Sequence, residues 1–142
     1  MINYELVKDK LAEIEQYYTT LQPLLAMAAR ELIEDVHKLR SMERHFQLIV
    51  DTALDVNAHI ITEMNLPMPD DYQNTFEVLG RHKVMPLEFA LRVAPSVGLR
   101  NRVVHKYGKV DVKRMVDEVK DGIPQYLEYL KYINDYLQKN EA

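Results

Sequence analysis

The stretch LRSMERHFQLIVDTALDVNAHII, residues 39–61, decides the fold. Its apolar residues recur in alternating steps of three and four, the spacing of one face of an α-helix. They are Leu39, Met42, Phe46, Ile49, Ala53, Val56 and Ile60, with a second row beside them at Val50, Leu54, Asn57 and Ile61. Two adjacent rows indicate a wide buried face. The sequence therefore predicts a long helix from about Glu31 to Met64, wide enough on its apolar side to serve both the core and a dimer interface.

The segment before this helix repeats the pattern, with apolar residues at Tyr4, Val7, Leu11, Ile14, Tyr18, Leu21 and Leu25. It predicts a first helix from about residue 3 to the low twenties, which Pro23 ends or bends. After the long helix, the run from Leu66 to Asp71 contains two prolines and breaks the periodicity. A short helix is expected at about residues 71–81.

Prolines divide the second half of the chain. Pro86 suits the first turn of a helix, and Pro95 should kink or split that helix. Ser96 is a candidate cap for the restart, and Gly108 a candidate C-terminal stop. The last apolar seam runs from Val112 to Leu137 across a glycine and a proline, so we expect a kinked helix or two collinear ones.

The chain contains four glycines and lacks the alternating β-branched pattern of strands. No linker composition interrupts it. The predicted fold is therefore all-α, a single domain over residues 1–142, built as an up-and-down bundle of five or six helices with a long second helix.

Composition excludes several classes of protein. The 142 residues include no cysteine, which rules out disulfides, thiolate metal sites and a cysteine nucleophile. The N-terminus lacks the basic and apolar regions of a signal peptide, and no run of eighteen apolar residues could span a membrane. A cytoplasmic protein is the simplest interpretation.

Charge is unevenly distributed along the chain. Residues 81–114 hold nine lysines or arginines and two acids, a net +7, on a chain whose total is −4. Such a basic island fits a phosphate-bearing ligand. A solvated basic surface explains the same pattern, and is slightly favoured on charge alone.

The candidate chemistry lies within this island, in the sequence LRNRVVHKYG at residues 99–108. On a helix Asn101 and His105 share a face, and Arg100 and Tyr107 lie seven residues apart and nearly eclipsed. Histidine can transfer protons near neutral pH. Arginine can hold a phosphate and stabilise additional charge in a transition state, while asparagine can orient the imidazole. These groups suit phosphodiester chemistry.

The spacing Arg–x4–His resembles the signature of the HEPN superfamily. The longer form, Arg–Asn–x3–His–x–Tyr, resembles the HepT branch and is filled here by Arg100, Asn101, His105 and Tyr107. The surroundings are similar as well: Met42, Glu43 and Arg44 open the long helix, Asp51 and Asp55 follow on it, and a proline-containing turn and a short helix precede the motif.

The resemblance implies an HEPN-type bundle and a homodimer whose paired motifs line a cleft. It also implies a toxin that cleaves RNA, tRNA or mRNA, rather than DNA. His105 would act as base or acid and Arg100 would stabilise the phosphorane formed by attack of the RNA's own 2′-hydroxyl. No metal and no other cofactor is expected. The implied partner is an MNT-type nucleotidyltransferase antitoxin, as in type VII-like systems, which can add AMP to the motif tyrosine, here Tyr107.

Other residues near the motif have two interpretations each. Asn101, Arg102 and Lys106 are candidate supporting or substrate-binding residues. Arg102 can bind phosphate or pair with an acid on the long helix, and the pairing is slightly favoured. Asp51 and Asp55 form a polar stripe, which is more often a solvated face than a support for Arg100 or His105.

Three functions remain open at this stage: a ribonuclease toxin, a module that binds RNA or nucleotide as partner of a nucleotidyltransferase without cleavage, and a non-catalytic scaffold.

Overall fold

The structure is a computed structural model that describes residues 1–105 and 111–141. Within these ranges the chain forms eight helical segments and no strand. The segments are α1 (Tyr4–Leu25), α2 (Ala29–Glu34), α3 (Val36–Glu63), α4 (Asn74–Arg81), α5 (Leu87–Val93), α6 (Pro95–His105), α7 (Val112–Gly122) and α8 (Gln125–Glu141). The all-α prediction is confirmed.

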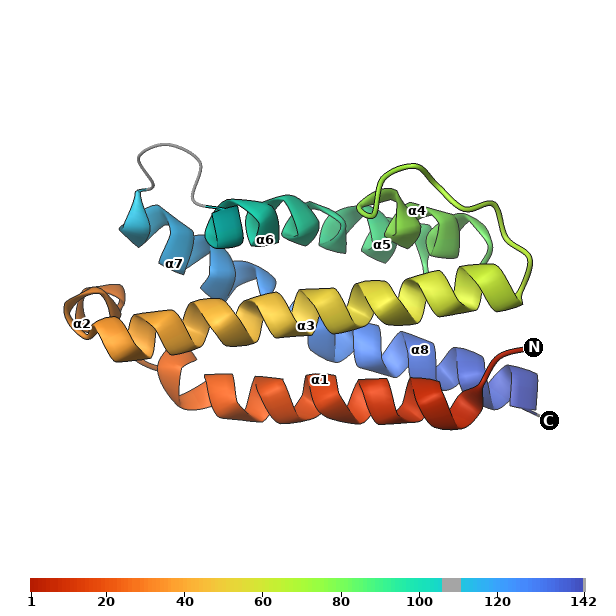
Figure 1. The fold of residues 1–142 in the computed structure, drawn as a ribbon, viewed down its shortest axis with the longest axis horizontal. Helices are drawn as coiled ribbons and strands as arrows, with labels where there is room; N and C mark the ends of the chain where they lie inside the picture. Colours follow the sequence, from red (N-terminus) through yellow and green to blue (C-terminus); the bar gives the residue numbers. More distant parts are fainter. Residues whose placement is uncertain (106–110, 142) are drawn as a thin grey trace.

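Helix α3 is the axis of the bundle. It crosses the middle of the molecule, with α1 along one side and α4, α5 and α6 along the other, and it packs against α1, α2, α4 and α6 (Figure 1). Both predicted apolar rows face the core, and every member is buried except Leu54, which is half-buried. The wide face is thus used within the chain, because helices pack on both sides of it.

The predicted start of the long helix at Glu31 was wrong. The backbone of Asp35 is extended, at φ −112° and ψ 96°, and its carboxylate accepts a hydrogen bond from the amide of Lys38. This is an N-cap, and it starts α3 at Val36. Glu31 belongs instead to the short α2, where its carboxylate accepts a bond from the amide of Ala28.

Prolines interrupt the helices where the sequence indicated. Pro95 separates α5 from α6, Pro124 separates α7 from α8, and α1 ends two residues after Pro23. Counting each separated pair as one interrupted helix gives six in the described chain, within the predicted range. Pro86 is the N-cap of α5 rather than a member of its first turn.

Two further boundary predictions differ from the structure. Ser96 is no N-cap, because α6 already begins at Pro95 and the Ser96 hydroxyl donates to the carbonyl of Val93. The short helix begins at Asn74 instead of about residue 71, since the Asp71 carboxylate holds the Gln73 amide in a turn. The candidate stop at Gly108 lies outside the described residues.

Buried polar bonds tie α8 to the helices around it. The Tyr129 hydroxyl lies 2.6 Å from Asn57 Oδ1 of α3, and Asn57 Nδ2 donates to Thr75 Oγ1 of α4 at 3.1 Å. The Tyr126 hydroxyl lies 2.6 Å from Ser96 Oγ of α6. Burial raises the pKa of Tyr126 and of Tyr129, so both phenols stay neutral donors. The network fixes α6 relative to α3 and α8.

Among the residues that the structure describes, no helix is long and apolar enough to cross a membrane.

Candidate functional site

Arg100 is held by a carboxylate on the neighbouring helix. Its Nε donates to Asp51 Oδ1 at 2.8 Å and its Nη2 to Asp51 Oδ2 at 3.1 Å. The two side chains are only 20% and 37% exposed. A two-point bond between planar groups fixes the direction of the guanidinium as well as its position. Asp51, which the sequence favoured as part of a solvated stripe, therefore orients the motif arginine.

The other motif residues in the described part of α6 follow along the same helix. Asn101 Oδ1 accepts a bond from Arg100 Nη1 at 3.2 Å, and the Asn101 side chain is exposed. His105 lies one turn further on, exposed, at the last described position of the helix. The described part of α6 thus carries a fixed guanidinium, an amide and an imidazole. Asn101 and His105 share one face, while Arg100 lies about 140° around the helix axis from His105. Lys106 and Tyr107 lie outside the described residues and stay predictions.

Arg102 points to a different neighbour from the one expected. Its Nη2 donates to Glu118 Oε2 of α7 at 2.9 Å, so its acid partner is not on α3. Glu118 also accepts from Arg114 Nε at 2.9 Å. The prediction that Arg102 pairs with an acid was correct. The helix that carries the acid was not predictable, because residue spacing cannot show that α7 folds back beside α6.

The basic island is less basic in space than in sequence. Arg92 pairs with Glu128, Lys113 with Asp117, and Glu118 takes two arginines. These acids come after residue 114 and were outside the segment on which the +7 was counted. In the described part of the island, acidic groups of α3, α7 and α8 neutralise most of the guanidinium charge.

A groove of about 480 Å³ opens beside the motif. Its walls are α3 and α6, and the turn before α4 closes one end. The lining residues are Asp51, Leu54, Asp55, Asp71, Tyr72, Val97, Arg100 and Asn101. Tyr72 is 68% exposed, an unusual exposure for an aromatic ring. Sequence reasoning did not select Asp71 or Tyr72, because the turn was interpreted only as a helix break.

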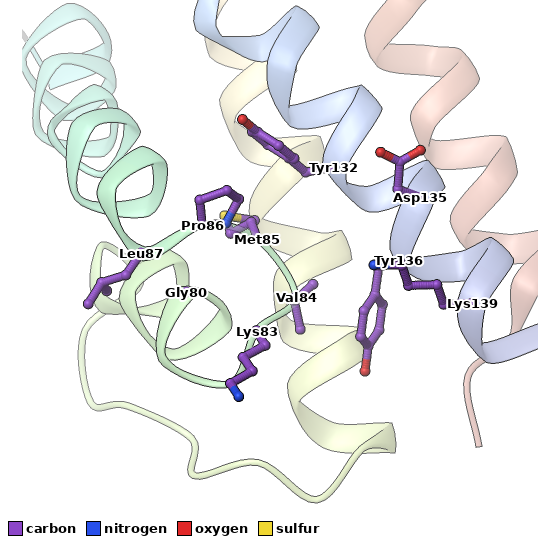
Figure 2. A pocket seen from close by; sticks show the side chains of 10 residues that line it. All are labelled: Gly80, Lys83, Val84, Met85, Pro86, Leu87, Tyr132, Asp135, Tyr136 and Lys139. Atoms are coloured by element: carbon purple, nitrogen blue, oxygen red, sulfur yellow. The ribbon is translucent and has the colours of Figure 1, made fainter.

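A second hollow of similar size, about 450 Å³, lies elsewhere on the molecule, between α8 and the turn that joins α4 to α5. Figure 2 shows Tyr132 and Tyr136 of α8 on one side and Met85, Pro86 and Lys83 on the other. Arg100, Asn101 and His105, the motif residues that the structure describes, do not line it. This hollow therefore serves as a reference site for experiments on the groove beside Arg100.

The described residues contain no group of three or more histidine and carboxylate side chains placed to hold a metal ion.

Comparison with known proteins finds similarity to HepT-like ribonucleases over most of the chain. The family described as "Ribonuclease HepT-like" matches residues 8–133. A tRNA nuclease HepT from Aphanizomenon flos-aquae is 30% identical over 139 residues, which cover 96% of this chain and 95% of that protein. An mRNA nuclease HepT from Shewanella oneidensis is 19% identical and covers 91% of this chain and 96% of that protein.

Solved structures of low identity share the fold. A tri-AMPylated Shewanella oneidensis HEPN toxin in complex with an MNT antitoxin superposes with a TM-score of 0.82 at 19% identity, covering 95% of this chain and 99% of that one. A cytosolic protein of unknown function from Bacillus subtilis, YutE, gives 0.83 at 15% identity, covering 98% and 93%. The bundle is therefore of the HEPN type.

Proposed function

Because this chain belongs to the HepT-like ribonuclease family, we propose that it is an RNA endonuclease with Arg100 and His105 as its catalytic residues. The observation that carries the proposal is the two-point bond that Arg100 donates to Asp51, on a helix that also carries the exposed His105. An arginine on a helix surface is well solvated without such a bond. An arginine that must meet a phosphate in one orientation needs a partner that fixes its guanidinium.

The reaction that fits these groups is an internal transesterification. The 2′-oxygen of the RNA attacks the adjacent phosphorus, the bond from phosphorus to the 5′-oxygen breaks, and a 2′,3′-cyclic phosphate remains. The 2′-hydroxyl loses a proton and the departing 5′-oxygen gains one. His105 moves one of these protons, and Arg100 stabilises the extra negative charge of the phosphorane. We propose that the step takes no metal, since the nucleophile is part of the substrate and Arg100 supplies the positive charge that stabilises the phosphorane.

The geometry assigns separate tasks to the donors of Arg100. Asp51 occupies Nε and one position on Nη2, and Asn101 accepts from Nη1. A guanidinium has five N–H donors, so two donors, one on each Nη, remain for phosphate oxygens. Asp51 and Asn101 are therefore positioning residues, while Arg100 contacts the substrate. Lys106 and Arg102 supply additional positive charge for the RNA. Arg102 does so by giving up its ion pair with Glu118.

We further propose that the protein is the toxin of a pair, that it acts as a homodimer, and that a nucleotidyltransferase antitoxin silences it. The structural relative from Shewanella oneidensis is an AMPylated toxin bound to an MNT antitoxin. Tyr107, two residues after His105, is the proposed acceptor of AMP. A phosphate and a nucleoside there would add negative charge and bulk where an RNA phosphate must lie.

Cleavage of total cellular RNA in EDTA tests the activity, with native protein beside His105→Ala. His82→Ala is a matched control, because His82 is an exposed histidine at the C-cap of α4. We expect cleavage by the native protein and the His82 variant and none by the His105 variant. Absence of cleavage by folded native protein, with RNA still bound, would favour a binding subunit instead.

Co-expression with an MNT-type nucleotidyltransferase tests the partnership. We expect a stable complex and one or more additions of AMP that disappear in Tyr107→Phe. An unmodified toxin that is still inhibited would show that the partner acts by binding alone.

A further inference from the structure

Resting on the proposed ribonuclease activity, we propose that the groove between α3 and α6 is a subsite for one nucleobase of the RNA. The base stacks on Tyr72 and presents an exocyclic amino group to the carboxylates of Asp55 and Asp71. Its nucleotide is a direct neighbour of the phosphodiester bound at Arg100. The groove would therefore select the base beside the cut.

The position of the groove supports this inference. Val97, Arg100 and Asn101 are successive members of one face of α6, and all three line the groove. His105 lies about 6 Å further along the helix axis from Asn101, on the side away from Val97. Arg100 itself lines the groove, and His105 lies beyond the Asn101 end of this face. An RNA strand whose reacting phosphate is bound at Arg100 therefore has a neighbouring nucleoside within reach of the groove.

The size and the aromatic ring fit a base. The groove encloses about 480 Å³, within the range of small-ligand sites. Tyr72 lines the groove and is 68% exposed, and its carbonyl accepts a bond from Thr75 Oγ1. That bond holds the turn that carries the ring. Unstacked RNA bases commonly stack on such aromatic rings.

Charge decides which part of the RNA can enter. Three carboxylates line the groove against one guanidinium, and Asp51 already pairs with that guanidinium. Asp55 forms a long ion pair with Lys10, 3.8 Å from Oδ2 to Nζ, and its side chain is 67% exposed. A phosphate would be repelled here, whereas an amino group donates well to a carboxylate.

The carboxylates also predict a preference among the bases. Asp71 uses Oδ1 to hold the Gln73 amide, and its Oδ2 accepts no bond from the residues that the structure describes, so it can accept from a base. Adenine, cytosine and guanine carry an exocyclic amine. Uracil has none, and its single ring donor, N3–H, lies between two carbonyl oxygens that a carboxylate repels. We therefore expect cleavage to be disfavoured where uracil occupies the subsite.

The test measures cleavage of short single-stranded RNAs that differ only in the base on either side of the cut. Native protein should cut the uracil substrate least. Tyr72→Ala should raise KM by about five- to a hundred-fold, the range for losing one stacked base, with a smaller change in kcat. Asp71→Asn keeps the turn, and its amide can donate to uracil, so the discrimination against uracil should shrink towards one.

Two controls separate the groove from general charge and folding effects. Asp135→Asn removes one negative charge from the hollow of Figure 2 and should leave both KM and base preference unchanged. Tyr72→Phe keeps the ring and should bind RNA almost as well as the native protein.

Each outcome bears on a different proposal. Cleavage without base preference, and without an increase in KM for Tyr72→Ala, would overturn the subsite and leave the ribonuclease intact. If native protein binds a fluorescent RNA without cutting it, the catalytic proposal fails, and the subsite is tested by the affinity of Tyr72→Ala. If no RNA binds at all, both proposals fail.

Discussion

The bond between Asp51 and Arg100 makes a quantitative prediction. Asp51→Asn removes the negative charge and leaves one side-chain oxygen, so one of the two bonds from the guanidinium is lost and the other keeps only its charged donor. A charge-assisted bond contributes about 1.5–3 kcal/mol. The pair is only partly shielded from water, which reduces its contribution to the free energy of unfolding. We expect a loss of about 1–2 kcal/mol in the free energy of unfolding.

Thermal unfolding measures this loss. For a chain of this size 1 kcal/mol corresponds to about 3 °C in Tm, so Asp51→Asn should unfold about 3–6 °C lower. Glu128→Gln is the matched control, because Glu128 pairs with Arg92 across two helices with side chains 46% and 51% exposed. An exposed pair contributes at most about 1 kcal/mol, and its Tm should fall by less than about 3 °C.

Activity should separate the two variants more clearly than stability. Loss of orientation in a catalytic group commonly costs up to about a hundred-fold in rate. We therefore expect Asp51→Asn to cleave RNA about ten- to a hundred-fold more slowly below its Tm, and Glu128→Gln to cleave at the native rate. The reasoning is refuted if both variants lose the same stability, or if Asp51→Asn cleaves RNA as fast as the native protein.

Two other sites give predictions from the packing of the core. Gly80→Ala should lower the free energy of unfolding by about 1–3 kcal/mol, because the new Cβ would lie 2.7 Å from Ala90 Cβ. Gly122→Ala is the control in the same thermal melt and should not destabilise the protein, since a Cβ there meets nothing within 4 Å. Equal melting temperatures for the two variants would contradict the close packing of α4 on α5. Tyr129→Phe should cost about 1–3 kcal/mol in denaturant titration, since Asn57 Oδ1 loses its buried donor, and a variant as stable as the native protein would contradict the network. Burial raises the pKa of Tyr129 above its unfolded value near 10, so its contribution to the free energy of unfolding is complete below pH 10 and is lost as pH rises beyond it. Ultraviolet titration should show this phenol ionising only when the protein unfolds. Reversible ionisation in the folded chain would disprove its burial.

The sequence predicted the helices well wherever one face alternates between apolar and polar. The two rows of α3 were predicted residue by residue, because steps of three and four have one simple explanation in a chain without strand patterns. The start of α3 could not be found in this way. Asp35 ends one helix and caps the next without interrupting the apolar spacing, so the periodicity hides the break.

The site was predictable along α6 and unpredictable across helices. Arg100, Asn101 and His105 share one helix, and their relation follows from residue number alone. The choice of Asp51 over Asp55 as partner of Arg100 depends on the rotation of α3 against α6, which no local pattern contains. The same limit applies to Glu118, whose position beside Arg102 depends on how α7 returns along α6.

Tertiary contacts also changed the meaning of the basic island. Its charge was counted over a continuous segment, while its neutralising acids lie on α3, α7 and α8. The proposed binding of RNA would have to exchange these ion pairs for phosphate contacts, and the net gain in binding free energy per arginine is smaller than the sequence suggests.

The chemistry proposed for Arg100 and His105 is tested most directly by the ends of the RNA it produces. A defined oligonucleotide is incubated with excess native protein in EDTA, and its fragments are identified by mass spectrometry, beside His105→Ala and a substrate with a single 2′-deoxy sugar at the cut. We expect fragments that end in a 2′,3′-cyclic phosphate from the native protein, and none from the variant or the deoxy substrate. Fragments that form only with added divalent metal, or that form equally from the deoxy substrate, would contradict the assignment of these two residues to a transesterification.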